Sequence, residues 1–188
     1  MVATLSISPV IKQAAKYLLP VLATLSLLLS EHGIAQSSSW LQPGEAEWRT
    51  EPLSAIDQQF MASQRQTVES LANKLGRSLS GATQRDLDTL QLILDRHLIE
   101  QEDVLTLQAL GVVLGDLLGD ELNMEWVVYR DRAGRSRALR YLTSDVFVFP
   151  VTLISRRWSV GSNKAVAAIY QDTVDATASR LPGAAWRR

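Results

Sequence analysis

Three stretches with helical periodicity follow one another in the middle of the chain. Apolar residues recur three or four positions apart over 54–75 and 83–97, which predicts two amphipathic helices. Ser54 is a typical helix N-cap, and Asp57 places negative charge in the first turn, where the helix dipole favours it. The third stretch, 102–118, is apolar on nearly all sides, which predicts a buried central helix.

Three glycines form a stripe along this third predicted helix. Gly111, Gly115 and Gly119 are spaced four residues apart and therefore share one face. A glycine inside a helix costs about 1 kcal/mol relative to alanine. We therefore expect another segment of backbone to approach this face closely.

After Asn123 the apolar period changes from helical to alternating, which is typical of strands. A turn containing Gly134 separates two such stretches and predicts a β-hairpin. The remaining predicted elements are a third strand over 145–149, a short helix over 150–158 and a last helix over 163–179. The expected fold is α+β, with helices packed on a small antiparallel sheet made of the hairpin and the third strand.

The first 35 residues have the three parts of a secretory signal. Two lysines precede an uncharged stretch over 17–30, and Gly33 and Ala35 supply the small residues of a cleavage site. Cleavage is expected between Ala35 and Gln36, with a bacterial periplasm or the medium as the destination. A retained membrane anchor is the alternative, although a spanning helix needs about 20 apolar residues.

The rest of the chain is expected to divide into a flexible tether over 36–52, a single domain over 53–180 and a frayed tail over 181–188. Polar residues and the turn signal Pro43-Gly44 mark the tether. Trp40 and Trp48 stand out in it, and we expect them to hold the tether against the domain; a ligand platform is the alternative.

Charge and composition exclude several classes of protein. The 19 basic and 20 acidic residues nearly balance, so we expect neither a nucleic-acid partner nor attraction to an anionic membrane surface. No stable membrane span is expected after signal cleavage. The chain has no cysteine, which rules out disulfides, thiolate metal sites, thiol catalysis and a lipid-modified N-terminus.

No complete set of catalytic residues can be found in the sequence, and no cofactor is expected. His97 is the one histidine beyond the signal, and its place near a helix end suits a surface residue. Asp116 and Asp120, one helical turn apart, are close enough to share a hard cation such as calcium, but a calcium loop collects more oxygens. Solvation of the helix end is the simpler explanation of these carboxylates.

Arginines are concentrated in the predicted hairpin, and two more lie beside a tryptophan. Grouped guanidinium groups can bind a carboxylate or a phosphate. The sequence favours a solvated hairpin, with Glu125, Asp131 and Asp145 neutralising much of the cluster and the charges discouraging edge pairing. A structural role is likewise favoured for Arg156-Arg157-Trp158, and binding of an anionic or peptide partner is the alternative at both places. The candidate partner-binding residues are Arg130, Arg132, Arg135, Arg137, Arg156, Arg157 and Trp158, with Arg140 also in the hairpin cluster.

The order of motifs resembles a bacterial family, domain-of-unknown-function family 3806. The resemblance rests on the glycine-bearing helix at Gly111–Gly115, the strand Glu125-Trp126-Val127-Val128, and Val148-Phe149-Pro150 leading to Ser155-Arg156-Arg157. It covers roughly residues 85–178. The family implies no activity, cofactor or catalytic residue for this chain.

These observations favour an exported, non-enzymatic protein that binds a protein or a component of the cell envelope. Two alternatives stay open. One is an envelope enzyme that depends on carboxylates or a metal, and the other is a periplasmic immunity or inhibitor protein.

Overall fold

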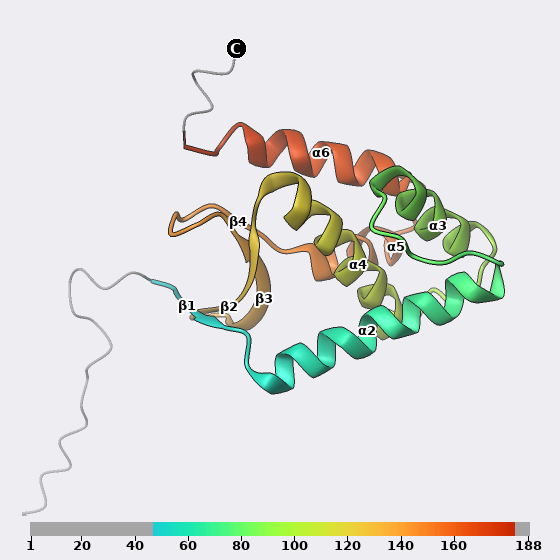
Figure 1. Ribbon diagram of the computed structural model, residues 1–188, viewed down its shortest axis with the longest axis horizontal. Helices are drawn as coiled ribbons and strands as arrows, with labels where there is room; N and C mark the ends of the chain where they lie inside the picture. Colours follow the sequence, from blue (N-terminus) through green and yellow to red (C-terminus); the bar gives the residue numbers. More distant parts are fainter. Residues whose placement is uncertain (1–46, 183–188) are drawn as a thin grey trace, which may run out of the picture. The chain divides into compact units, whose positions relative to one another are not determined.

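A computed structural model describes residues 47–182 of the chain. The predicted signal with its cleavage site at Ala35 and Gln36, the tether up to residue 46 and most of the predicted tail lie outside the described residues. The described part is a helical layer packed on one antiparallel sheet (Figure 1). The predicted α+β class is therefore confirmed.

Five α-helices and a four-stranded sheet follow the order expected from the sequence, apart from the first strand. The sheet order is β1-β2-β3-β4, and every pair of neighbours is antiparallel. The elements are β1 (Arg49–Pro52), α2 (Ala55–Lys74), α3 (Thr83–Asp95), α4 (Val104–Leu122), β2 (Glu125–Asp131), β3 (Gly134–Arg140), β4 (Phe147–Val148), the 3-10 helix η1 (Pro150–Thr152), α5 (Ser155–Trp158) and α6 (Val166–Ala178).

Strand β1 lies in the segment that was expected to be tether. Its residues pair with β2 from Arg49 opposite Arg130 to Pro52 opposite Val127. Just before it, Trp48 stacks on Tyr129 with the ring centroids 6.0 Å apart and meets Phe147 edge-on at 4.8 Å. Residues 48–52 are thus part of the sheet and its outer aromatic cluster, and Trp48 makes the contact with the domain that was expected of it.

Helix α4 is the centre of the core, as its apolar composition predicts. It is contacted by α2, α3, α5, α6 and η1, and Figure 1 shows it enclosed between α2 and α6. Leu107, Leu110 and Leu114 are completely buried. Within residues 47–182, no helix combines the length and the apolar character needed to cross a membrane.

The glycine stripe of α4 is where the chain approaches this helix most closely. A Cβ atom on Gly111 would lie 2.4 Å from the carbonyl oxygen of Val151, and one on Gly115 would lie 2.4 Å from the indole ring of Trp126. The prediction of a close backbone approach is confirmed at Gly111, where η1 crosses the helix. This packing fixes η1, and α5 directly after it, against α4.

Candidate functional site

The site is built around Asp57, a carboxylate that is 1% exposed in the first turn of α2. Ser54 and Asp57 form a capping box: the Asp57 amide donates to Ser54 Oγ, and the Ser54 amide donates to Asp57 Oδ2 at 3.1 Å. The helix start therefore holds this carboxylate in one position at the edge of the sheet.

Two arginines of β3 converge on this carboxylate. Arg135 and Arg137 are two residues apart on one strand, so their side chains lie on the same face. Arg135 donates from Nη2 to Asp57 Oδ2, and Arg137 donates from Nε to Oδ1 at 3.1 Å. The Nη2 atom of Arg137 lies 2.9 Å from the same oxygen. The guanidinium group of Arg137 also lies 4.0 Å from the centre of the Phe60 ring, which adds a cation–π contact.

The surroundings of Asp57 keep it ionised. Burial alone would raise the pKa of its carboxyl group, but the hydrogen bonds from Arg135 and Ser54 outweigh burial and hold the pKa well below its ordinary value. The carboxylate thus compensates one of the two arginine charges, whatever the pH of a physiological compartment.

Next to this cluster is a hollow of about 410 Å³, which we call the arginine pocket. Its walls come from β3, from the segment after β4 and from α5. It is lined by Arg135, Ser136, Arg137, Phe149, Val151, Thr152 and Arg156. The pocket is therefore formed by three segments that the packing of η1 on α4 brings together.

Arg156 contributes a further positive charge to this pocket. It is exposed and forms no ion pair within residues 47–182. Three guanidinium groups thus line the pocket, and Asp57 is the one carboxylate within the described residues that pairs with any of them. The three guanidinium charges and the one carboxylate together leave a net charge of +2 at this place.

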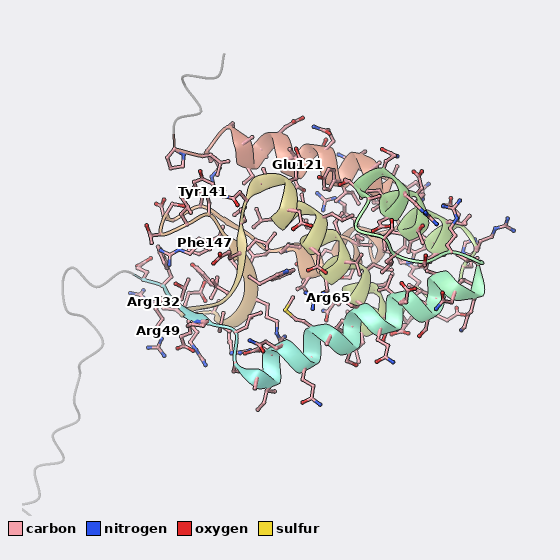
Figure 2. All side chains as sticks on the ribbon, in the orientation of Figure 1. Arg49, Arg65, Glu121, Arg132, Tyr141 and Phe147 are labelled. Carbon is pink, nitrogen blue, oxygen red and sulfur yellow. The ribbon has the colours of Figure 1, made fainter. Side chains whose placement is uncertain are left out.

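The other predicted arginines serve other contacts. Arg130 pairs with Glu51 at 3.1 Å and Arg132 with Glu47 at 3.5 Å, which ties the hairpin to the segment around β1. Figure 2 shows Arg132 at the same end of the sheet as Arg49. Arg140 donates to Thr50 Oγ1 and to two loop carbonyl groups.

The three candidate residues after η1, Arg156, Arg157 and Trp158, also make different contacts. Arg157 donates from Nη1 to the Leu153 carbonyl oxygen at 2.9 Å, and Trp158 is half-buried against the core. Of the three residues, Arg156 alone lines the arginine pocket.

The structure also differs from the sequence interpretation in the acidic partners. Glu125, Asp131 and Asp145 were expected to neutralise the hairpin, yet the carboxylates that pair with its arginines are Glu47, Glu51 and Asp57. These come from the segment preceding the domain's first helix and from the start of that helix. The capping pattern of Asp57 signalled a helix start and gave no sign of an ion-pair partner about 80 residues away.

The sequence favours solvation of the helix end over cation binding for Asp116 and Asp120, and the structure differs at Asp116: Asp120 is exposed, whereas Asp116 is half-buried and paired. Asp116 accepts two hydrogen bonds from Arg65, at 2.7 and 2.8 Å, and one from the indole of Trp126 at 2.9 Å. No three His, Asp or Glu side chains in the described part of the chain are grouped to hold a metal ion. His97 lies exposed just after α3.

Comparison with known proteins confirms the family resemblance found in the sequence. The model of the family described as Domain of unknown function (DUF3806) matches residues 86–170. Residues 86–170 are therefore similar to this family. The matched residues run from α3 into α6 and include Arg135, Arg137 and Arg156, whereas β1 and α2, with Asp57, precede them.

A solved structure supports the fold of this domain. A crystal structure of a protein from Bacteroides thetaiotaomicron VPI-5482 aligns with a TM-score of 0.62 and 20% sequence identity, over 72% of this chain. The chain spans 51% of the length of that protein. No curated protein matches the chain. The similarity supports the fold and assigns no activity to the chain.

Proposed function

We propose that the domain described here is a non-enzymatic binding module whose arginine pocket takes a dianionic group of a protein or of an envelope component. One observation carries the proposal: three guanidinium groups line a single hollow of about 410 Å³, and one carboxylate compensates them. Such a hollow has room for a small ligand group.

Arginine suits this role because its planar guanidinium group can present two parallel donors to a carboxylate or phosphate. Asp57 orients Arg135 and Arg137 before any ligand arrives, so less side-chain freedom is lost on binding. Arg156, free of such a partner, is the residue most able to turn toward the incoming group. A group with two negative charges would match the net charge of +2 at the pocket.

The test of the arginine pocket is a titration with matched small anions followed by NMR. Succinate and phenyl phosphate at pH 8, both dianions, are expected to shift the amide resonances of Ser136, Thr152 and Arg156. Butyrate, of similar size with a single charge, is expected to bind several-fold more weakly. Arg156→Gln is expected to weaken binding of the dianions by about ten-fold, the size of a lost charged hydrogen bond.

Arg85→Gln is the matched control, because Arg85 is an exposed arginine of α3 that does not line the arginine pocket. This variant should bind both dianions as the unmodified protein does. Unchanged binding in Arg156→Gln, or an equal loss in both variants, would contradict the proposed site.

We also propose that the chain is exported. The basic, apolar and small-residue parts of residues 1–35 support this proposal. In a bacterial host, fractionation is expected to recover the protein outside the cytoplasm, and sequencing of its N-terminus is expected to begin at Gln36. Recovery of the protein in the cytoplasm with Met1 in place would contradict the export proposal and would not affect the binding proposal.

A further inference from the structure

A second hollow, of about 460 Å³, lies between α2, α4 and the loop that joins α2 to α3. It shares no lining residue with the arginine pocket. We call it the acidic groove. Its apolar surface comes from Leu79 of the loop and from Val113 and Leu117 of α4, of which Val113 and Leu117 are almost entirely buried beneath it.

The polar groups along this groove are mostly acidic. Four carboxyl groups line it, and Arg65 supplies the one positive side chain. The positive charge of Arg65 can balance one of these carboxyl groups, which leaves a surplus of three. The four acidic residues are Glu69, Asp86, Asp116 and Asp120.

Three of these carboxyl groups also build the walls. Glu69 accepts from the Leu79 amide at 2.9 Å, and Asp86 accepts from the Ser80 and Gly81 amides, so both hold the loop in place. Asp116 is held between Arg65 and Trp126, and Figure 2 shows Arg65 between α2 and α4. The groove is thus formed before any ligand binds.

Asp120 differs from the other three acids. It is exposed, and within residues 47–182 it takes part in no side-chain hydrogen bond or ion pair. It lies one helical turn beyond Asp116 at the rim of the groove, so its carboxylate is available to a bound molecule.

From this arrangement we infer that the acidic groove binds a small organic cation, a primary ammonium carried on an apolar chain. The apolar body lies on Val113, Leu117 and Leu79, and the ammonium group meets Asp120 at the rim. An anionic ligand is disfavoured by the surplus of carboxyl groups, and a neutral one leaves Asp120 without a partner. This site is independent of the function proposed for the arginine pocket.

The test compares three six-carbon probes on the full chain by NMR: hexylammonium, hexanol and hexanoate. Hexylammonium is expected to shift the amide resonances of Gly81, Leu117 and Asp120, with hexanol binding about three- to five-fold more weakly and hexanoate more weakly still. A factor of about three to five is the size expected of one charge pair in contact with water.

Asp120→Asn is expected to weaken hexylammonium binding about three- to five-fold and to leave hexanol binding unchanged. Asp88→Asn is the matched control, because Asp88 is an exposed carboxylate of α3 outside the groove, and it should alter neither. Equal affinity for the three probes, no shift of the groove amides, or an equal loss in both variants would overturn the inference.

Discussion

Replacing Gly111 with alanine is expected to lower the free energy of unfolding by about 2 kcal/mol or more. The added Cβ atom would lie 2.4 Å from the carbonyl oxygen of Val151 and 2.7 Å from that of Pro150. Both neighbours are backbone atoms, so the clash is relieved only if η1 moves away from α4. Urea unfolding at pH 7, followed by circular dichroism, measures the change.

The same substitution at Gly119 is the control. A Cβ atom there would lie 3.0 Å from the Met124 carbonyl oxygen and 3.3 Å from Leu139, so the neighbours need to give far less. Alanine also gains about 1 kcal/mol over glycine in a helix interior, which offsets this smaller strain. Gly119→Ala is therefore expected to stay within about 1 kcal/mol of the unmodified protein. Equal effects of the two substitutions would contradict the importance of the η1 crossing.

The fit of η1 on Gly111 also connects stability with the arginine pocket. Val151 and Thr152 line the pocket, and Arg156 follows on α5. A displacement of η1 would therefore move Arg156 relative to Arg135 and Arg137. Gly111→Ala should accordingly weaken dianion binding as well as stability, whereas Gly119→Ala should leave binding unchanged.

Most of the helices and the hairpin could be predicted because their signals are local. The capping residues Ser54 and Asp57 fix the start of α2, and the unbroken apolar composition of α4 identifies the central helix. The glycine stripe predicted a close approach, since glycine in a helix is costly without one. It could not predict that Val151 makes the approach, because that depends on how the chain returns from the sheet.

Strand β1 was missed for a physical reason. Its four residues, Arg49 to Pro52, have no alternation of apolar and polar side chains, and proline is unfavourable inside a sheet. The segment is extended because it pairs with β2, which is about 80 residues further along the chain. An edge strand of this kind is set by its partner and leaves little trace in its own sequence.

The arginines of the candidate site could be predicted from the sequence, whereas the carboxylates that pair with them could not. The density of arginine in the hairpin is visible along the sequence, and strand alternation places Arg135 and Arg137 on one face. Their partner Asp57 is distant in sequence. Its role as a helix-capping residue was enough to explain its presence, so nothing in the sequence indicated a second role. In the structure the same carboxylate caps α2 and accepts hydrogen bonds from Arg135 and Arg137 of β3.

Asp57→Asn is expected to lower the free energy of unfolding at pH 7 by about 3 kcal/mol. Removing one partner of a buried ion pair costs about 3–5 kcal/mol, and the partial exposure of Arg135 and Arg137, 34% and 20%, places the loss at the lower end. The amide side chain keeps the size of the original, so the loss measures charge and hydrogen bonding.

The dependence on pH separates this charge effect from a packing defect. The folded-state pKa of Asp57 is depressed, so its stabilising contribution is present above the ordinary carboxyl pKa near 3.8 and is lost as the pH falls below that value. At pH 3 the gap between the unmodified protein and Asp57→Asn should therefore narrow by about 1 kcal/mol. Urea unfolding at pH 7 and pH 3 measures both gaps.

The exposed Asp88 provides the comparison for this titration. Asp88→Asn should change the free energy of unfolding by no more than about 0.5 kcal/mol at either pH, since surface substitutions seldom do more. Equal destabilisation by Asp57→Asn at pH 7 and pH 3 would contradict a contribution from the charge of Asp57. The narrowing gap is expected instead because the charge of Asp57 joins α2 to the two arginines of β3 and thereby shapes the wall of the arginine pocket.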